Sequence, residues 1–230
     1  MQGDFPFCRR TYFPHYTRRK DATPTGDSAL HLWLDTALPA AVDNPEGIRQ
    51  ACAAPRGEAK TTFVDVPENS WYADAADFVA QRGLMSGVGE NLFGGNQNTT
   101  RAMLMTILAR MDGQDVTGGA TWYEKAMNWA KQTGVSDGTM PEVNITREQL
   151  ATMLYSYAKL KRIDTTQGGM AVREFNDYDS ISGWAGQSMT WAVNAGILSG
   201  RGNNTLAPTA GATRAEMAVM LQQFVGLMEQ

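Results

Sequence analysis

A pattern that occurs three times between residues 61 and 230 constrains the fold more than any other feature of this sequence. Trp71, Trp122 and Trp184 open the three copies and lie 51 and 62 residues apart. Copies of roughly 45 residues cannot bury their apolar faces alone, so we expect the three to pack on one another. Each copy has a glycine twelve residues after its tryptophan and a second glycine four residues later: Gly83 and Gly87, Gly134 and Gly138, Gly196 and Gly200.

The spacing of apolar residues predicts a helix at the start of each copy. Positions 0, 4, 7 and 8 from each tryptophan are small or apolar, and these offsets share one face of an α-helix. The first glycine stands where a left-handed residue commonly ends a helix. We therefore expect about three helical turns in each copy, with Trp129 and Trp191 in the core. Trp71, Trp122 and Trp184 begin these helices, where half exposure is expected.

A threonine–arginine pair predicts the start of a second helix in each copy. Segments 146–149 (TREQ) and 213–216 (TRAE) have the pattern of a capping box, in which threonine and the third residue inside the helix cap each other. Segment 100–103 (TRAM) keeps the threonine and lacks the reciprocal partner. We expect Glu148 and Glu216 to be structural, and Pro141 and Pro208 to occupy one position of the approach loop.

Composition excludes several kinds of activity from the repeated part. Residues 61–230 contain no cysteine and no histidine, which excludes cysteine nucleophiles, histidine-based triads and Cys/His zinc sites there. The chain has a net charge of −4 and a pI near 5.2, which argues against a nucleic-acid partner. Its apolar runs are too short for a membrane span. We expect neither a metal nor a cofactor.

The first sixty residues differ from the repeats. They hold both cysteines (Cys8 and Cys52), both histidines and six of the nine prolines. We expect a leader over 1–60, irregular apart from one short helix near 28–38, with no ordinary signal peptide and a solvated basic run at 18–20. The domains expected after it are repeat 1 (61–113), repeat 2 (118–162) and repeat 3 (173–230), and the fold class is all-α.

The joint pattern resembles the S-layer homology (SLH) domain. Repeat 3 matches closely through 175–177 (FND), Trp184, the 196–200 turn and 213–216 (TRAE). Repeat 1 matches through 63–66 (FVDV) and its turn, with TRAM in place of TRAE. Repeat 2 has lost the F-x-D segment but retains Trp122 and 145–148 (ITRE).

This resemblance implies a pseudo-threefold all-α unit that binds secondary cell wall polymer, often pyruvylated, in grooves between copies. It implies a non-catalytic anchor on the bacterial cell surface, outside the cell, with the peptidoglycan-linked wall as partner and no membrane span. The tryptophan, the second glycine and the cap arginine of each copy are the implied contact residues. The full set is Trp71, Gly87, Arg101, Trp122, Gly138, Arg147, Trp184, Gly200 and Arg214, with Asp65 and Asp177 as further candidates.

The chemistry of these residues suits an acidic sugar. An arginine one residue inside a helix start adds a forked donor to exposed backbone N–H groups, and both favour a carboxylate. A glycine lets the backbone approach a sugar ring, and an indole offers an apolar face. The alternative for each arginine is a surface ion pair, and the alternative for Asp65 and Asp177 is a turn cap. We expect Arg214→Ala to weaken polymer binding more than Arg147→Ala, because repeat 2 lacks its F-x-D segment.

Two other functions remain open at this stage. A carbohydrate-active enzyme could use acids such as Asp65, Asp177 or Glu216, yet these occur once per copy rather than as a unique pair in distinct environments. A helical-repeat module that binds a protein partner would need a large exposed apolar groove. Small polar clefts rimmed by arginine would favour the wall-binding hypothesis instead.

Overall fold

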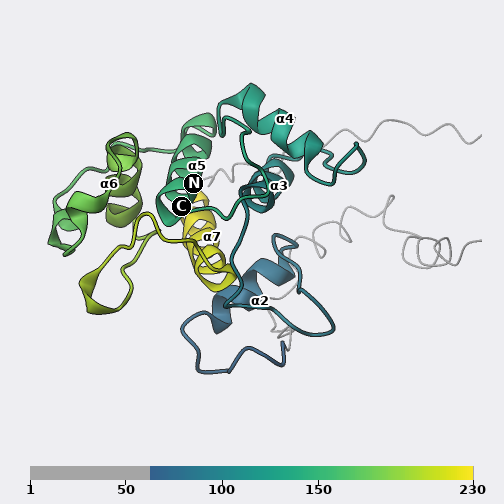
Figure 1. Ribbon diagram of the computed structural model, residues 1–230, viewed down its shortest axis with the longest axis horizontal. Helices are drawn as coiled ribbons and strands as arrows, with labels where there is room; N and C mark the ends of the chain where they lie inside the picture. The colour runs from purple at the N-terminus through teal and green to yellow at the C-terminus, as the bar shows by residue number, and fades with distance from the viewer. Residues whose placement is uncertain (1–62, 230) are drawn as a thin grey trace, which may run out of the picture. The chain divides into compact units, whose positions relative to one another are not determined.

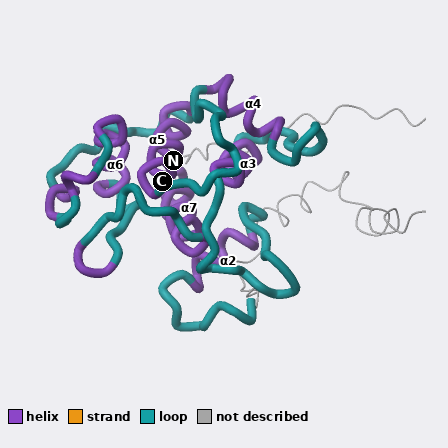
Figure 2. The backbone as a smooth tube through the Cα atoms, viewed as in Figure 1, coloured by secondary structure: helices purple, strands orange, loops and turns teal. Residues whose placement is uncertain are grey.

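The computed structural model describes residues 63–229. Among the described residues the chain is helical and contains no strand (Figures 1 and 2), which confirms the all-α prediction. None of these helices is both long and apolar enough to cross a membrane. The predictions of a leader over 1–60, a helix near 28–38 and a solvated run at 18–20 lie outside the described residues.

Each repeat supplies a short first helix and a longer second helix. The first helices are α2 (Ala73–Gln81), α4 (Glu124–Thr133) and α6 (Gly186–Asn194), and the second helices are α3 (Arg101–Met111), α5 (Arg147–Leu160) and α7 (Arg214–Met228). Short 3-10 turns precede and follow α6, at Ala171–Glu174, Tyr178–Ser180, Gly183–Ala185 and Gly202–Asn204.

The ends of the first helices agree with the sequence pattern better than their starts do. Gly83, Gly134 and Gly196 have φ angles of 65°, 73° and 71°, so the predicted left-handed ends are confirmed. Trp71 and Trp122, however, lie in turns two residues ahead of α2 and α4. Trp71 and Trp122 therefore lie before the helix rather than on its apolar face, and their rings are exposed.

The predicted caps of the second helices are confirmed. Capping boxes start α5 and α7, in which Thr146 pairs with Gln149 and Thr213 with Glu216. The hydroxyl of Thr100 accepts from the amide of Met103 at the start of α3, without a reciprocal bond. The three second helices therefore begin alike, and the three repeats share one local geometry at this point.

Helices from different repeats pair with one another. The first helix of each repeat packs on the second helix of the repeat before it: α4 on α3, and α6 on α5. The first helix of repeat 1, α2, packs on the last helix, α7, which closes the ring (Figure 1). Each second helix thus packs against the first helix of the following repeat. The last helix, α7, packs against α2 at the other end of the repeated region.

Three backbone hydrogen bonds form a closed cycle at the centre of the ring. The amide of Thr99 donates to the carbonyl of Ala212 at 3.0 Å, Ala212 donates to Ile145 at 2.9 Å, and Ile145 donates back to Thr99 at 2.9 Å. Each residue directly precedes the capping threonine of a second helix, and all three are fully buried. This cycle marks the pseudo-threefold axis.

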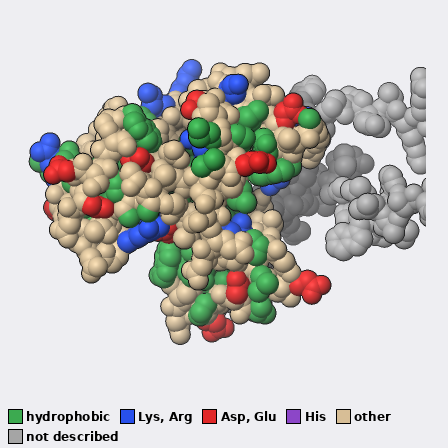
Figure 3. Space-filling view, viewed as in Figure 1, with side chains coloured by type: hydrophobic (Ala, Val, Ile, Leu, Met, Phe, Trp, Pro, Cys, Tyr) green, Lys and Arg blue, Asp and Glu red, His purple; other side chains and the backbone are tan. Residues whose placement is uncertain are grey.

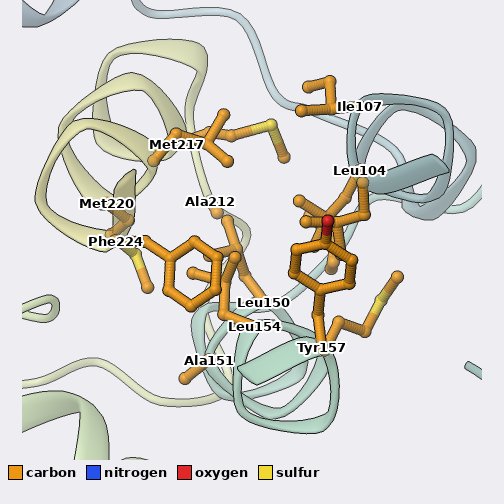
Figure 4. Packing of buried hydrophobic residues seen from close by; sticks show 14 of the residues in the cluster. Leu104, Ile107, Leu150, Ala151, Leu154, Tyr157, Ala212, Met217, Met220 and Phe224 are labelled. Carbon is orange, nitrogen blue, oxygen red and sulfur yellow. The ribbon is translucent and has the colours of Figure 1, made fainter. Parts of the chain in front are cut away.

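The core lies where α3, α5 and α7 converge (Figure 4). The ring centroids of Tyr157 and Phe224 are 6.0 Å apart. Trp129 and Trp191 are 8% and 1% exposed, so both predicted core tryptophans are confirmed. The second helices contribute to this core Leu104, Ile107, Leu150, Ala151, Leu154, Tyr157, Met217, Met220 and Phe224.

Candidate functional site

Three grooves surround the axis, and each is named here by the tryptophan at its edge. The Trp71 groove has a volume of about 610 Å³, the Trp184 groove about 480 Å³ and the Trp122 groove about 330 Å³. Their tryptophans are 67%, 58% and 55% exposed, which confirms the predicted half exposure. Large exposed indoles at the edge of a cleft offer a flat surface to a ligand.

Every groove is assembled from all three repeats. The Trp71 groove is formed by the 197–202 turn and α7 of repeat 3, by Arg147 of repeat 2 and by Trp71 of repeat 1. The other two follow the same rule: the Trp184 groove combines the repeat 2 turn and α5 with Arg101, and the Trp122 groove combines the repeat 1 turn and α3 with Arg214.

The predicted tryptophans, glycines and arginines come together across repeats. Trp71 meets Gly200 and Arg147, and Trp122 meets Gly87 and Arg214, so each tryptophan, turn and arginine belong to different repeats. Trp184 meets Arg101 and the turn at 134–137, while Gly138 is not among the residues that line that groove. The expectation of grooves between copies holds, and the structure adds which copy supplies each part.

The cap arginines join neighbouring repeats to each other. Arg147 is 3% exposed, and its Nε and Nη2 donate to the carbonyls of Leu206 at 2.7 Å and Ser199 at 2.6 Å. Arg214 is 7% exposed and donates from Nε to Phe93 and from Nη2 to Ser86. These guanidiniums form part of the groove walls and also hold the loops that shape them, so neither is the simple surface ion pair of the alternative hypothesis.

Arg101 differs because its main partner is a carboxylate in the groove. Its Nη2 lies 2.5 Å from Oδ1 of Asp137, and its Nε donates to the carbonyl of Thr139 at 2.9 Å. The side chain of Asp137 is 62% exposed. Burial alone would raise the pKa of Asp137, but hydrogen bonds from Thr139 and the charge of Arg101 lower it overall.

The backbone amides at the second-helix starts are not available to a ligand. At α3, the amides of Arg101 and Ala102 donate to the carbonyls of Val143 and Pro141 at 3.1 and 2.7 Å. The corresponding amides of α5 donate to Ala210 and Pro208, and those of α7 to Gln97 and Gly95. The expected anion site on exposed N–H groups is therefore wrong, because these groups bind the approach loop of the next repeat. Pro141, Pro208 and Gly95 occupy equivalent positions of the approach loops, because the carbonyl of each accepts from the second amide of a second helix.

Two of the second glycines, Gly87 and Gly200, are exposed and line grooves, but a side chain on either would point at packed groups. A Cβ on Gly200 would lie 2.5 Å from a ring carbon of Phe175, and a Cβ on Gly87 would lie 2.7 Å from the carbonyl oxygen of Leu92 and 3.3 Å from the ring of Phe63. Phe63 and Phe175 are the first residues of the two F-x-D segments. Packing of these rings thus requires the glycines, and the expectation that they also admit a sugar stays a prediction.

Asp65 and Asp177 lie outside the three grooves. Both oxygens of Asp65 accept 2.7 Å hydrogen bonds, from the amides of Phe93 and Gly94. Asp177 accepts bonds of the same length from Leu206 and Ala207. Each aspartate therefore clamps the loop 28–30 residues downstream, whereas the sequence predicted ligand contact or a turn cap near the first helix. Burial alone would raise the pKa of Asp65, but the two amides lower it overall.

The aspartates of the F-x-D segments, Asp65 and Asp177, also act on two of the groove arginines. Asp65 acts electrostatically on Arg214, and Asp177 on Arg147. Repeat 2 has no F-x-D segment, and there Asp137 of the turn supplies the negative charge to Arg101. In repeat 2 the carboxylate that acts on the cap arginine therefore lies in the groove wall, whereas Asp65 and Asp177 lie outside the grooves.

Glu216 organises the Trp71 groove. Its carboxylate accepts from Arg147 Nη1 at 2.7 Å and from Arg201 Nε and Nη2 at 2.6 and 2.7 Å. Burial alone would raise the pKa of Glu216, but bonds from Arg201 and the Thr213 amide and the charge of Arg147 hold it below its ordinary value. Glu148 instead accepts from the amide and hydroxyl of Ser182. Both glutamates are structural, as expected.

Sequence reasoning missed Arg201 and Arg110, which line the Trp71 and Trp122 grooves. Neither has an equivalent in the other copies, so aligning the repeats hides them. On the face in Figure 3, charged side chains are scattered rather than gathered in one patch. Among residues 63–229, no group of three or more His, Cys, Asp or Glu side chains could hold a metal ion.

Comparison with known proteins identifies two regions of this chain. The model of the S-layer homology domain matches residues 62–102 and 174–218, in repeats 1 and 3. An amylopullulanase from Thermoanaerobacterium thermosulfurigenes is 30% identical over 184 residues, covering 74% of this chain and 10% of that protein. S-layer protein sap from Bacillus anthracis is 26% identical over 178 residues, covering 72% and 21%. A cellulosome-anchoring protein from Acetivibrio thermocellus is 26% identical over 178 residues, covering 69% and 38%. The chain thus spans well under half the length of these relatives.

Proposed function

We propose that residues 61–230 form a non-catalytic module that anchors a protein to the bacterial cell surface by binding secondary cell wall polymer. The observation that carries this proposal is the triplicate groove, in which an exposed indole faces a turn and a guanidinium from two other repeats. A repeating polymer is the ligand that suits a repeated site, because linked sites raise overall affinity by about 10²–10⁴ without any new kind of contact.

The relatives support a shared role in attachment. They are named as an enzyme, an S-layer protein and a cellulosome-anchoring protein, and this chain matches only a part of each. A part common to proteins of such different names is best explained by a common location rather than a common reaction. The last of these names states an anchoring role for that protein, and we extend the role to this chain.

The polymer proposed is a pyruvylated polysaccharide attached to peptidoglycan. A pyruvyl ketal carries a fixed carboxylate, and guanidiniums in a cleft bind carboxylates through charge-assisted hydrogen bonds. Because the helix-start amides are paired with carbonyls, side chains must supply this recognition. The exposed indoles then offer their faces to the C–H surface of the sugar.

Repeat 2 serves as the third SLH copy in this proposal. It keeps the capping box, the left-handed glycine and the carbonyl contact made by Pro141. Its loss of the F-x-D segment is offset by Asp137, which pairs with Arg101. These features support a domain organisation of three copies over 61–113, 118–162 and 173–230.

The alternative functions fit the geometry less well. Asp65 and Asp177 have both carboxylate oxygens bound to backbone amides, and Glu216 is paired with two arginines. None of these acids is poised for general acid–base chemistry. The grooves are small and rimmed by arginine, which favours a sugar over a helix of a protein partner.

Sedimentation with purified cell wall sacculi tests the proposal. The chain should sediment with native sacculi and remain in the supernatant with sacculi stripped of pyruvyl groups. Replacing Trp71, Trp122 and Trp184 together by alanine should abolish sedimentation, whereas Met170→Ala should not, since Met170 is 63% exposed and lines none of the three grooves. Equal binding to stripped sacculi would remove the carboxylate from the proposal, and full binding by the triple variant would exclude the grooves.

A further inference from the structure

The three grooves differ in the charged side chains that line them. The Trp184 groove is lined by Arg101 and Asp137, whose charges cancel. The Trp71 groove is lined by Arg147, Arg201 and Glu216, and both guanidiniums contact the glutamate. The charged residues that line the Trp122 groove are Arg110 and Arg214. Among the groove walls of the described chain, only this one combines two cations with no carboxylate.

Two positions of the second helix produce this difference. The third helical residue, which completes a capping box when it is Glu or Gln, is Met103 in α3, Gln149 in α5 and Glu216 in α7, and all three line their grooves. The tenth helical residue is Arg110 in α3 and Ser156 in α5, and both line their grooves. Because repeat 1 has Met103 where T-R-A-E has glutamate, its groove lacks this acid. Arg110, seven residues further along α3, adds a cation.

Within residues 63–229, each groove keeps one guanidinium nitrogen without a protein acceptor, Nη1 of Arg101, Arg201 or Arg214, so the grooves differ in the carboxylates beside these cations. Arg147 donates from Nε, Nη1 and Nη2 to protein atoms, and Arg201 gives Nε and Nη2 to Glu216. Arg214 donates from Nε and Nη2 to carbonyls, and within residues 63–229 its Nη1 has no protein acceptor. Arg110 is exposed and forms no ion pair with the described chain.

One carboxylate outside the Trp122 groove, that of Asp65, acts electrostatically on Arg214. Asp65 is bound to the amides of Phe93 and Gly94, and its charge acts on Arg214. It does not line the groove, so it offsets part of one positive charge without occupying space or donors that a ligand would use. Arg110 is left as the uncompensated cation at the groove wall.

We infer that the Trp122 groove is the anion-selective site of the three, with Arg110 as its specificity-determining residue, and that the Trp184 groove accepts uncharged sugar. The inference rests on the proposed function and names the ligand class of each groove. In the Trp122 groove, Arg110 and the free Nη1 of Arg214 bind the carboxylate of an acidic sugar. Met103 and Ile107 supply an apolar floor beside these cations. In the Trp184 groove, Asp137 pairs with Nη2 of Arg101, so a second carboxylate would meet repulsion from its charge.

The indole N–H signals of the three groove tryptophans test this directly by nuclear magnetic resonance. Each signal is assigned with a Trp→Phe variant and then followed during titration with two probes. The first probe is a methyl hexopyranoside carrying a pyruvyl ketal, and the second is the same hexoside without the ketal. We expect the ketal probe to shift the Trp122 signal at a concentration at least about fivefold lower than the Trp184 signal, and added salt to weaken the Trp122 response.

Substitutions that remove or add one charge sharpen the test. Arg110→Gln and Met103→Glu should each weaken ketal binding at Trp122 by about fivefold or more. Asp137→Asn should produce ketal binding at Trp184, because it removes the negative charge beside Arg101 while keeping an oxygen to cap the turn. Arg162→Gln, an exposed change outside the three grooves, should change none of the three responses.

The outcomes separate this inference from the proposed function. If the ketal probe shifts all three signals at one concentration, or if Arg110→Gln and Arg162→Gln behave alike, the charge ordering is overturned while polymer binding stands. If the probe shifts none of the signals and the chain also ignores native sacculi, both the inference and the proposed function fail.

Discussion

The Nε–H of Arg214 donates a 2.8 Å hydrogen bond to the carbonyl of Phe93, 121 residues earlier in the chain. This bond joins the start of the last helix to the loop of the first repeat, beside the packing of α2 on α7. Arg147 makes the corresponding bond to Leu206, and Arg101 to Thr139. The same residue type thus closes the ring and builds each groove wall, so stability and binding share these three side chains.

Removal of repeat 3 should unfold the remainder. A fragment ending at residue 170 lacks α6 and α7, which leaves α5 and α2 without their partners and breaks the backbone cycle at Ala212. We expect this fragment to show no cooperative thermal transition by circular dichroism, while residues 61–230 melt as one unit. A fragment that retains a sharp transition would contradict the closed-ring interpretation.

Loss of Arg147 should destabilise the fold more than loss of Arg101. Arg147→Met leaves the carbonyls of Leu206 and Ser199 and one side of Glu216 without a buried donor, and we expect a cost of about 3 kcal/mol. Arg101→Met breaks a pair whose aspartate is 62% exposed, and we expect about 1 kcal/mol. Urea unfolding at neutral pH measures both values.

The same comparison revises the expected order of binding losses. The sequence predicted that Arg214→Ala would weaken polymer binding more than Arg147→Ala, because Arg147 belongs to the degenerate repeat 2. In the structure, Arg147 lines a groove built on repeat 3, and it is Arg101 that lines the groove of repeat 2. Binding measured on arginine variants must therefore be accompanied by their unfolding free energies, since equal losses could reflect an unfolded ring.

Glycine at position 200 should be required for packing. A Cβ there would lie 2.5 Å from the ring of Phe175, whereas a Cβ on Gly202 would meet nothing within 4 Å. We expect Gly200→Ala to cost about 1–3 kcal/mol in unfolding free energy and Gly202→Ala to cost little. Adding Phe175→Leu to Gly200→Ala should restore part of the loss. If it restores nothing, the clash with Phe175 is not the cause.

Much of the fold could be predicted from sequence because its signals are local. The glycines that end the first helices, the capping boxes and the core positions of Trp129 and Trp191 depend on residues within one turn of each other. The pairing of α2 with α7, and of each first helix with the preceding second helix, depends on contacts far apart in the sequence, and the repeat pattern is the same for either pairing.

The site could be predicted in kind but not in detail. Repetition identified the tryptophans and cap arginines, because these recur once per copy. Repetition does not say which tryptophan and arginine share a groove, because this depends on how the ring closes, and the ring brings Trp71 to Arg147. Asp65 was misjudged for the same reason, since the loop that it clamps lies 28 residues away at Phe93.

Acid should weaken the fold through carboxylates whose pKa the folded state lowers. Glu216 and Asp65 both have lowered pKa values in the fold, and unfolding returns them to the ordinary values of about 4.3 and 3.9. Their stabilising contribution is complete above those unfolded values and is lost as the pH falls through the lowered ones. Urea unfolding from pH 7 to pH 2 should show decreasing stability below about pH 4.5. Glu216→Gln should reduce the slope, and the exposed change Glu90→Gln should not.

Two tryptophans in one repeat should separate binding from stability. Trp129 is 8% exposed and donates from Nε1 to Asp112 at 3.0 Å, with Tyr157 at its edge. Trp129→Ala should therefore cost about 3–5 kcal/mol of unfolding free energy. Trp122 is 55% exposed and contacts the ring of Tyr123 edge-on, so Trp122→Ala should cost under about 1 kcal/mol. It should nevertheless weaken sedimentation with sacculi, because the loss falls on a groove wall. A Trp122→Ala variant that binds sacculi as well as the parent chain, with its unfolding free energy unchanged, would show that this indole does not contact the polymer.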